Sequence, residues 1–588
     1  MRPLMSLLFL LFTVGASASQ NLITPAAWYK QFLPSNATGE NVMTSINGTN
    51  QDVIKLKCLI PTQPFYGIIY GQVITPNIPA GHRLRLTFRA RSVTQNPVRV
   101  VLEKNDAPYT AITDSNIILT PQWKPYTAIG TTPGFGPKGT GLKIQFGHQA
   151  GTLEFTEIKV EDIGMDPAVI AAKEALMPES IKKRIDKYRK GDLLIEVKDR
   201  AGKPIKNAKV RVEMKRHAFL FGCNFFGLEP AKDDSAQVAY RDRFSALFNY
   251  ATLPFYWGAF EPEKGKPQYD RLNAMALWCN QHNIITKGHP LVWHEVYPAW
   301  APNDVDSAIP MLKQRVLDIV TYFAEKGHGQ IHIWDVLNEA NAAAAFANGE
   351  GAWIKRDGPA KVVGTALQWA REAGKGKTET FIYNDFNTGS ENVALLTALK
   401  ASNTLPDVIG IQSHMHGGTW PMDQLWAITE KFSQFGRPLH YTETTIISGP
   451  RRDVDFTKGL TDWYTTPEDE QKQADYVDQF YTVLFSHPNM RGITWWDFSD
   501  SGAWLGAPSG FLRKDMSPKP VYDRLMKKIH EEWWTNTEGQ TANNGSYKTR
   551  AFYGDYVISA TDAKGHSSSV KVTLPMGIAA GKFSITVK

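Results

Sequence analysis

The sequence has few cysteines, and past its first residues it has no long hydrophobic run. Its three cysteines, Cys58, Cys223 and Cys279, cannot form a disulfide framework, and no Cys-x-x-Cys pair indicates a structural zinc site. No internal stretch is apolar over the roughly 20 residues that a membrane helix needs, so we expect no membrane span. These absences favour a globular protein held together by its hydrophobic cores.

The chain also lacks a strong excess of charge of either sign. There are 65 Lys and Arg against 58 Asp and Glu, spread along the chain, so we expect no nucleic-acid partner. One basic run, "IKKRIDKYRKGD" at 181–192, has helical spacing, and it is interpreted as a solvated helix face rather than a phosphate-binding patch.

The N-terminus has the pattern of a secretory signal peptide. In "MRPLMSLLFLLFTVGASASQN", Arg2 precedes an apolar run from Leu4 to Val14, and Ala16-Ser17-Ala18 offers a small-residue cleavage site. The apolar run is too short to span a membrane. We therefore predict a signal peptide at 1–18 and an exported protein, either periplasmic or secreted.

The 588 residues indicate several domains, and the first, at 19–163, is predicted to be a β-sandwich. The run "HRLRLTFRARS" places Leu84, Leu86, Phe88 and Ala90 on one strand face, and further short alternating runs follow without a helix signal. With "WKPYT" at 123–127, this region resembles jelly-roll carbohydrate-binding modules. Four aromatic residues are candidates for a sugar platform or for the core: Tyr66, Tyr70, Tyr109 and Trp123.

Two separated segments are predicted to form one further, smaller sandwich. A helical connector is expected at 164–190, followed by a hairpin at 191–215 with a Gly-Lys-Pro turn; short strands with Asn-Gly and Lys-Gly turns return at 535–588. A lone hairpin is marginally stable, so pairing the two pieces is favoured. Together they resemble a carboxypeptidase regulatory-like domain, split around the domain between them.

Residues 216–534 alternate between predicted strands and helices. "MLKQRVLDIVTYFAEKG" places Leu312, Val316, Ile319, Val320 and Phe323 on one helical face before Gly327, and "IHIWDV" then has the pattern of a buried strand. Repeated β-α units over about 300 residues predict an α/β fold, a (β/α)8 TIM barrel, with functional groups at the carboxyl ends of its strands.

Two glutamates follow such strands. Glu339 ends "WDVLNE" and Glu443 lies in "HYTETTI". Two carboxylates facing one cleft suit glycoside hydrolysis, with one as general acid and the other as nucleophile. The histidines nearby, His289, His294, His414 and His416, have no three-ligand metal spacing, so they are interpreted as hydrogen-bonded barrel residues, and we expect no metal and no cofactor.

The linked motifs "KGHPLVWH", "WDVLNEA", "GIQSHMH", "TET", "GITWWDFSD" and "PKPVYDRL" closely resemble glycoside hydrolase family 10, the retaining endo-β-1,4-xylanases. The resemblance implies that Glu339 is the acid/base and that Glu443 is the nucleophile. It also implies substrate-binding roles for His289, Trp293, Asn338, Gln412, His414, Trp496 and Trp504, with Asn338 on the sugar 2-hydroxyl and His414 keeping the nucleophile ionised.

One segment departs from the family pattern. Where members carry "E-N-x-M-K-W", this chain has the shorter "YATLPFYW", in which Leu253, Pro254, Phe255 and Tyr256 offer stacking and shape but no charged group. "TETTI" likewise replaces "TELDI". The predicted partner is a polysaccharide, xylan or a decorated xylan, and a monomer is expected. The alternatives are a retaining glycosidase for another β-linked glycan, or a glycan-binding barrel without hydrolytic activity.

Overall fold

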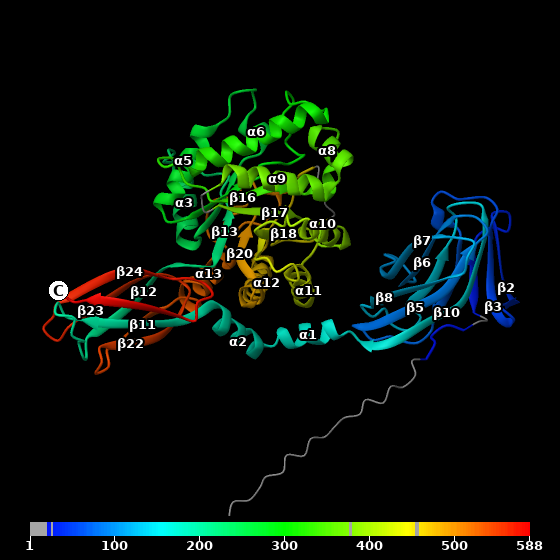
Figure 1. Cartoon of the computed structure of the whole chain (residues 1–588), viewed down its shortest axis with the longest axis horizontal. Coiled ribbons are helices and arrows are strands. Elements are labelled where there is room, and N and C mark those ends of the chain that lie inside the picture. Colours follow the sequence, from blue (N-terminus) through cyan, green and yellow to red (C-terminus); the bar gives the residue numbers. More distant parts are fainter. Residues whose placement is uncertain (1–19, 25–26, 376–378, 453–454, 456–457) are drawn as a thin grey trace, which may run out of the picture. The chain divides into compact units, whose positions relative to one another are not determined.

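The computed structural model describes residues 20–588 apart from 25–26, 376–378, 453–454 and 456–457 (Figure 1). The predicted signal peptide therefore lies outside the described residues. The chain forms two compact units, divided between Lys173 and Glu174. Within the described part of the chain, no helix combines the length and the apolar character needed to cross a bilayer.

The first unit is a sandwich of two five-stranded antiparallel sheets. One sheet has the order β1 (Trp28–Gln31), β4 (Ile69–Ile74), β9 (Thr140–Gln145), β6 (Asn96–Lys104), β7 (Ala111–Leu119). The other has the order β2 (Ala37–Ile46), β3 (Thr49–Cys58), β10 (Gly151–Met165), β5 (His82–Ser92), β8 (Lys124–Thr131). The alternation predicted for β5 is confirmed, because Leu84, Leu86, Phe88 and Ala90 are all buried in the core between the sheets. A short 3-10 turn, η1 (Phe65–Gly67), precedes β4.

The four candidate platform aromatics have different environments. Tyr70 is buried and stacks on Trp28 with ring centroids 5.2 Å apart, so of the two alternatives it belongs to the core. Trp123 lies beneath the guanidinium of Arg91 at 4.8 Å. Tyr66 and Tyr109 are more than half exposed. Core packing therefore accounts for Tyr70, while Trp123 and Tyr109 are in cation–π contacts, the latter with Lys143 Nζ at 4.7 Å.

Two helices, α1 (Pro167–Ala175) and α2 (Pro178–Arg189), follow the sandwich. The basic run begins on α2 as predicted, and four of its eight charged residues are exposed, namely Lys182, Lys183, Asp186 and Lys187. Arg189 at the end of α2 differs most from the prediction, since its side chain is fully buried. It donates hydrogen bonds to the carbonyls of Phe485 and His487 and lies against the Phe219 ring at 5.0 Å, so it joins α2 to the barrel.

The second unit contains the split sandwich and the barrel. Strand β11 (Lys190–Lys198) lies between β22 (Ser546–Phe552) and β25 (Ala580–Thr586). Strand β12 (Lys209–His217) lies between β21 (Asn536–Gln540) and β23 (Gly554–Thr561), and β24 (Ser567–Leu574) completes that sheet. The segments before and after the barrel therefore complete one another's sheets, which confirms the predicted sandwich split around the barrel.

Eight parallel strands close the predicted barrel: β13 (Leu220–Asn224), β14 (Tyr250–Pro254), β15 (Ile285–His289), β16 (Ile333–Asn338), β17 (Thr380–Asp385), β18 (Val408–Met415), β19 (Leu439–Ile446) and β20 (Met490–Trp495). The helices along this part of the chain are α3 (Ser235–Leu247), α4 (Trp257–Phe260), α5 (Tyr269–Gln281), α6 (Val305–Ala324), α7 (Ala340–Ala343), α8 (Gly349–Asp357), α9 (Pro359–Ala373), α10 (Ser390–Ala401), α11 (Met422–Ser433), α12 (Pro467–Ser486) and α13 (Pro520–Lys527). This part of the chain also contains a 3-10 turn, η2 (Trp504–Gly506), and a π-helical turn, η3 (Lys528–Glu532). The main helices lie around the outside of the strands (Figure 1).

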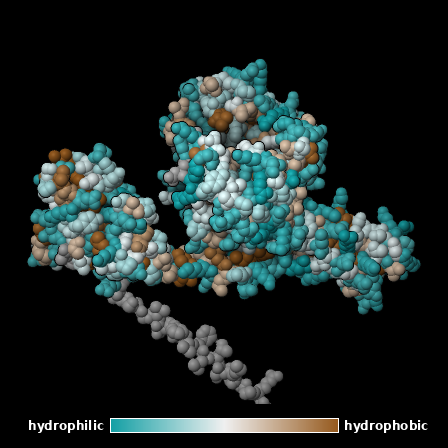
Figure 2. All heavy atoms as spheres, turned by 180° about the vertical axis from the view of Figure 1, so that it is seen from behind, coloured by the Kyte–Doolittle hydropathy of each residue, from teal (hydrophilic) through white to brown (hydrophobic). Residues whose placement is uncertain are grey.

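Helix α6 shows how the local sequence sets these elements. The Asp304 side chain caps its first turn by accepting a hydrogen bond from the Ser307 N–H. The predicted apolar face, from Leu312 to Phe323, is buried. The helix ends at Ala324, three residues before Gly327, whose φ of +99° suits glycine. Figure 2 shows polar residues over most of the face in view, as expected when each helix turns its apolar side inward.

Candidate active site

The carboxyl ends of four barrel strands bring polar side chains into one layer. In the register of the barrel, Asn338 on β16 pairs with Asn384 on β17, and Gln412 on β18 pairs with Glu443 on β19. Glu339 follows β16 with left-handed backbone at φ +58°, and its N–H donates to the Asn384 carbonyl at 2.9 Å. Left-handed backbone is uncommon outside glycine, and such strain concentrates at functional sites.

These strand ends open into a cavity of about 1070 Å³. The structure brings all nine sequence-predicted site residues to its wall: His289, Trp293, Asn338, Glu339, Gln412, His414, Glu443, Trp496 and Trp504. They come from six different segments of the chain, so the convergence is a property of the barrel and not of local sequence.

Glu443 is held as a carboxylate. Its Oε2 lies 3.0 Å from His414 Nε2, and its Oε1 accepts a hydrogen bond from Asn384 Nδ2 at 2.6 Å. Burial by itself would raise the pKa of Glu443, but the nearby His289, the hydrogen bond with His414 and the charge of Lys287 lower it below its ordinary value. A buried carboxylate that stays ionised is suited to act as a nucleophile.

Glu339 has the opposite character. Burial raises its pKa to about 8, with a further contribution from the negative charge of Glu443. Its Oε1 accepts hydrogen bonds from Gln412 at 2.8 Å and Asn338 at 3.0 Å, and its Oε2 accepts one from Trp293 Nε1 at 3.1 Å. A carboxyl group that keeps its proton near neutral pH is suited to act as a general acid.

A second layer of charge lies beneath Glu443. Asp335 Oδ2 lies 2.6 Å from Lys287 Nζ and 2.7 Å from His289 Nδ1, while His289 Nε2 lies 3.7 Å from Glu443 Oε1. Burial would raise the pKa of Asp335, yet Lys287 and His289 lower it below its ordinary value. Asp335 therefore orients the His289 ring toward Glu443, because a carboxylate on one ring nitrogen fixes the position of the imidazole.

Aromatic rings form the walls. Tyr256 and Trp293 lie with ring centroids 5.1 Å apart, and Trp496 meets the edge of His414 at 5.7 Å. Trp504 lies 4.8 Å from His414 and is about one-third exposed. Flat apolar faces beside hydrogen-bonding groups are suited to sugar rings, which have apolar faces and polar edges.

The segment that carries Trp504 is fixed by Asp497. Asp497 Oδ1 accepts from the Trp504 N–H at 3.0 Å, and Oδ2 accepts from the Ser509 hydroxyl at 2.7 Å. Burial raises the pKa of Asp497 to about 6. The next residue, Leu505, adopts φ +61°, so this turn is held by its tertiary contacts.

The segment "YATLPFYW", which departs from the family pattern, contributes fewer residues to the cavity than the sequence predicted. Leu253 and Phe255 are fully buried, and the Phe255 ring packs on Phe323 and Trp334, so their assignment as stacking groups is wrong. Tyr256 alone of the four named residues lines the cavity. Phe255 and Tyr256 follow the end of β14 at Pro254, and the Tyr256 ring contacts Trp293 at the cavity while the Phe255 ring packs in the interior.

Five residues of the site were not singled out from the sequence: Lys287, Glu295, Asp335, Asn384 and Asp497. Three of them follow a signal that was present, a polar side chain at or near the end of an apolar strand, as with Asn384 in "TFIYND". Lys287 and Asp335 lie inside strands, where only the closed barrel brings them together.

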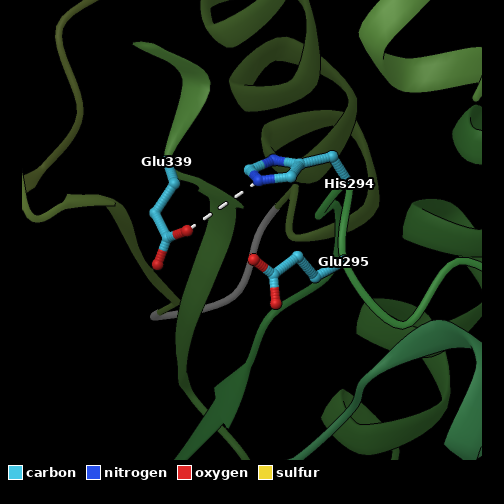
Figure 3. Close-up of side chains that lie close together, drawn as sticks. All are labelled: His294, Glu295 and Glu339. Atoms are coloured by element: carbon cyan, nitrogen blue, oxygen red, sulfur yellow. Dashed lines mark ion pairs between the residues drawn. The ribbon is translucent and has the colours of Figure 1, made fainter. Parts of the chain in front are cut away.

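One cluster combines a histidine with two carboxylates (Figure 3). Ligand atoms of His294, Glu295 and Glu339 lie within 4.8 Å of one another, and His294 Nε2 is 3.9 Å from Glu339 Oε2. Burial lowers the pKa of His294 to about 4, so its ring is neutral at pH 7. Neither ring nitrogen of His294 has a hydrogen-bond partner among the described residues, unlike the bonded histidine that the sequence suggested. A divalent cation could bridge such atoms.

Comparison with known proteins places this site in a family. The model for "Glycosyl hydrolase family 10" matches residues 224–528, just over half of the chain. Among curated relatives, "Anti-sigma-I factor RsgI6" of Acetivibrio thermocellus is 27% identical over 393 residues, covering 65% of this chain and 46% of that protein. "Endo-1,4-beta-xylanase B" of Thermotoga neapolitana is 25% identical over 331 residues, covering 53% of this chain and 88% of that protein.

Solved structures include xylanase 10B from Thermotoga petrophila in complex with xylobiose, with a TM-score of 0.44 and 21% identity over 53% of this chain and 95% of that one. A GH10 structure from Paenibacillus barcinonensis has a TM-score of 0.45 at the same identity and coverage. The family-model match runs from the last residue of β13 to the end of α13, the segment that supplies every wall residue of the cavity. The chain belongs to glycosyl hydrolase family 10.

Proposed function

We propose that this protein is a retaining endo-β-1,4-xylanase that cleaves the xylan backbone by double displacement. The observation that carries the proposal is the pair of carboxyl groups in one cavity, Glu339 with its pKa raised to about 8 and Glu443 with its pKa lowered. Opposite perturbation of two neighbouring carboxyl groups is the pattern expected of an acid and a nucleophile. Relatives named as endo-1,4-β-xylanases support the choice of substrate.

In the first step, the Glu443 carboxylate attacks the anomeric carbon of the bound sugar, and the bond to the leaving oxygen breaks. Glu339 gives its proton to that oxygen, so the departing chain leaves as a neutral alcohol. The product is a glycosyl ester on Glu443. Asn384 and His414, which hydrogen-bond Glu443 before attack, orient its oxygens toward the sugar.

In the second step, Glu339 acts as a base. Esterification removes the negative charge of Glu443, which after burial is the largest cause that raises the pKa of Glu339. Glu339, now ionised, takes a proton from water, the oxygen of that water attacks the anomeric carbon, and the ester bond to Glu443 breaks. Two inversions at one carbon give net retention of configuration.

The remaining wall residues bind the substrate in this proposal. Asn338 donates to the sugar 2-hydroxyl, a contact that strengthens as the ring flattens in the transition state. Its orientation is set because its Oδ1 accepts from Asn384 Nδ2 at 2.8 Å and from Gln412 at 3.3 Å. Trp293, Trp496 and Trp504 offer apolar faces to the sugar rings, and His289 and Gln412 offer polar atoms to its edge.

The proposal extends to the whole chain. The signal pattern at 1–18 supports export, and the N-terminal sandwich is proposed as a glycan-binding module that holds the enzyme on its polymer. The shortened "YATLPFYW" segment removes charged groups and favours a second candidate, a decorated xylan or another β-linked glycan as the preferred substrate.

The test is product analysis of the purified mature chain on unbranched xylan, arabinoxylan, glucuronoxylan, mixed-linkage glucan and cellulose, with Glu443→Ala as the inactive control. We expect xylo-oligosaccharides from the xylans that are absent in the control. Proton NMR of the first products should show the β-anomer before mutarotation. Five intact polymers would refute hydrolysis of these substrates, and α-anomeric first products would refute retention.

A further inference from the structure

Glu295 places a third carboxylate beside the proton donor. One of its oxygens lies within 4.8 Å of both His294 and the Glu339 carboxylate, and the side chain points toward Glu339 in Figure 3. Glu295 is exposed to the cavity and has no ion pair or hydrogen bond with any side chain of the described chain. Because Glu339 must reach the oxygen of the cleaved bond, Glu295 lies beside the sugars that flank that bond.

The backbone that presents Glu295 is held in a costly conformation. The next residue, Val296, adopts φ +49° although it is β-branched, and its side chain is about half exposed at the cavity. Its carbonyl accepts from the Gly258 N–H at 2.7 Å, and a Cβ on Gly258 would lie 2.6 Å from that oxygen. Strain of this kind persists where tertiary structure enforces it, and it clusters at ligand sites.

Apart from the histidines, the chargeable side chains that line the cavity are all acidic or tyrosine hydroxyls. Four carboxyl side chains line it, those of Glu295, Glu339, Glu443 and Asp497. Over the described residues that form its wall, no Lys or Arg is present. A carboxylate accepts hydrogen bonds from neutral sugar hydroxyls but repels another carboxylate.

From this arrangement we infer that Glu295 is a specificity-determining residue that directs cleavage to bonds flanked by uncharged sugars and disfavours bonds whose flanking sugars carry a uronic acid. The inference rests on the proposed xylanase function and selects within it: arabinoxylan is a good substrate, and glucuronoxylan is cut only away from its acidic branches. Hydroxyl groups of a neutral sugar donate to the free Glu295 oxygens, and a uronate carboxylate there meets a like charge.

The experiment compares kcat/KM on two xylo-oligosaccharides of equal length, one unbranched and one with a single glucuronic acid on a sugar flanking the cleaved bond. The variant is Glu295→Gln, which keeps shape and hydrogen bonding but removes the charge. Glu263→Gln is the matched control, since Glu263 is an exposed residue whose partner is Lys266 and which does not line the cavity. EDTA is present throughout, so that no cation bridges the cluster with His294 and Glu339.

We expect the wild type to prefer the neutral substrate and Glu295→Gln to reduce that preference by about 3-fold to 50-fold, the effect of a like charge about 7 Å away at effective dielectric constants from about 80 to about 20. The difference should shrink in 1 M salt, where the Debye length is about 3 Å. On glucuronoxylan the variant should release shorter acidic products.

The outcomes distinguish failure of the role inferred for Glu295 from failure of the proposed xylanase function. An unchanged preference in Glu295→Gln, or an equal change in Glu263→Gln, overturns the role of Glu295 while hydrolysis of the neutral substrate still supports the xylanase. A wild type that prefers the acidic substrate overturns it as well. Failure to cleave either oligosaccharide counts against the proposed function itself.

Discussion

The electrostatic coupling between Glu339 and Glu443, the proposed acid and nucleophile, can be measured by removing the charge of one. In Glu443→Gln the negative charge beside Glu339 is lost, while the burial that contributes most to the raised pKa remains. Retaining enzymes place their two carboxyl groups about 5.5 Å apart, and at an effective dielectric constant of about 20 this separation corresponds to about 3 kcal/mol. That energy equals about two pKa units, so the pKa of Glu339 should fall from about 8 to about 6.

The assay is a ¹³C NMR titration of protein labelled at the glutamate carboxyl carbons, with Glu339→Gln used to assign the signal. Glu263→Gln, which removes an exposed charge elsewhere, should leave the titration of Glu339 unchanged. In the wild type, activity should fall as pH rises through about 8, because the proton donor is then ionised. A wild-type Glu339 that titrates near the ordinary value of about 4.3, or a pKa unchanged in Glu443→Gln, would refute the reasoning.

Three further predictions test stability and the charge network. Because the folded pKa of Glu339 lies above its unfolded value, the free energy of unfolding should decline as pH rises from about 4.5 to 8. Glu339→Gln should remove up to about 4 kcal/mol of that decline, measured by urea titration at pH 5 and pH 8. An equal effect of the substitution at both pH values would contradict this. His414→Ala should lower kcat about tenfold to a hundredfold and move the acidic limb of the pH profile to higher pH, since Glu443 loses a hydrogen bond that lowers its pKa. An acidic limb at unchanged pH would argue against a role of His414 in keeping Glu443 ionised. Arg189→Met should lower the free energy of unfolding by about 2–4 kcal/mol, because two buried carbonyls lose their hydrogen-bond donor. The pH profile of activity should not change. A loss below about 0.5 kcal/mol would show that Arg189 does not join α2 to the barrel.

The architecture was predictable because it depends on repeating local patterns. The buried face of α6 follows from apolar residues three and four apart, and the core face of β5 follows from strict alternation. The barrel follows from the repetition of such units, and it implies that groups at strand ends share one cavity. The pairing of β11 and β12 with strands more than 300 residues later was predictable because a lone hairpin leaves its edges unpaired.

The errors of prediction lie where burial depends on contacts between distant residues. Phe255 and Arg189 were misplaced, and Tyr70 was left open between platform and core, because each side chain is compatible with both surface and core. Only the neighbours supplied by the fold decide between them. Arg189 is the clearest case, since its partners are carbonyls nearly 300 residues away. No local pattern encodes such a partner.

The sequence by itself therefore determined the barrel, the split sandwich and the two glutamates at neighbouring strand ends, because periodicity and strand order are local properties. Only the tertiary structure decided that Glu339 holds a proton while Glu443 does not, since that difference comes from burial and from His289, His414 and Lys287 on other strands. It also decided that Glu295 faces the cavity from a strained turn against Gly258. Desolvation and Coulomb interactions depend on distances in space, and a linear sequence does not contain those distances.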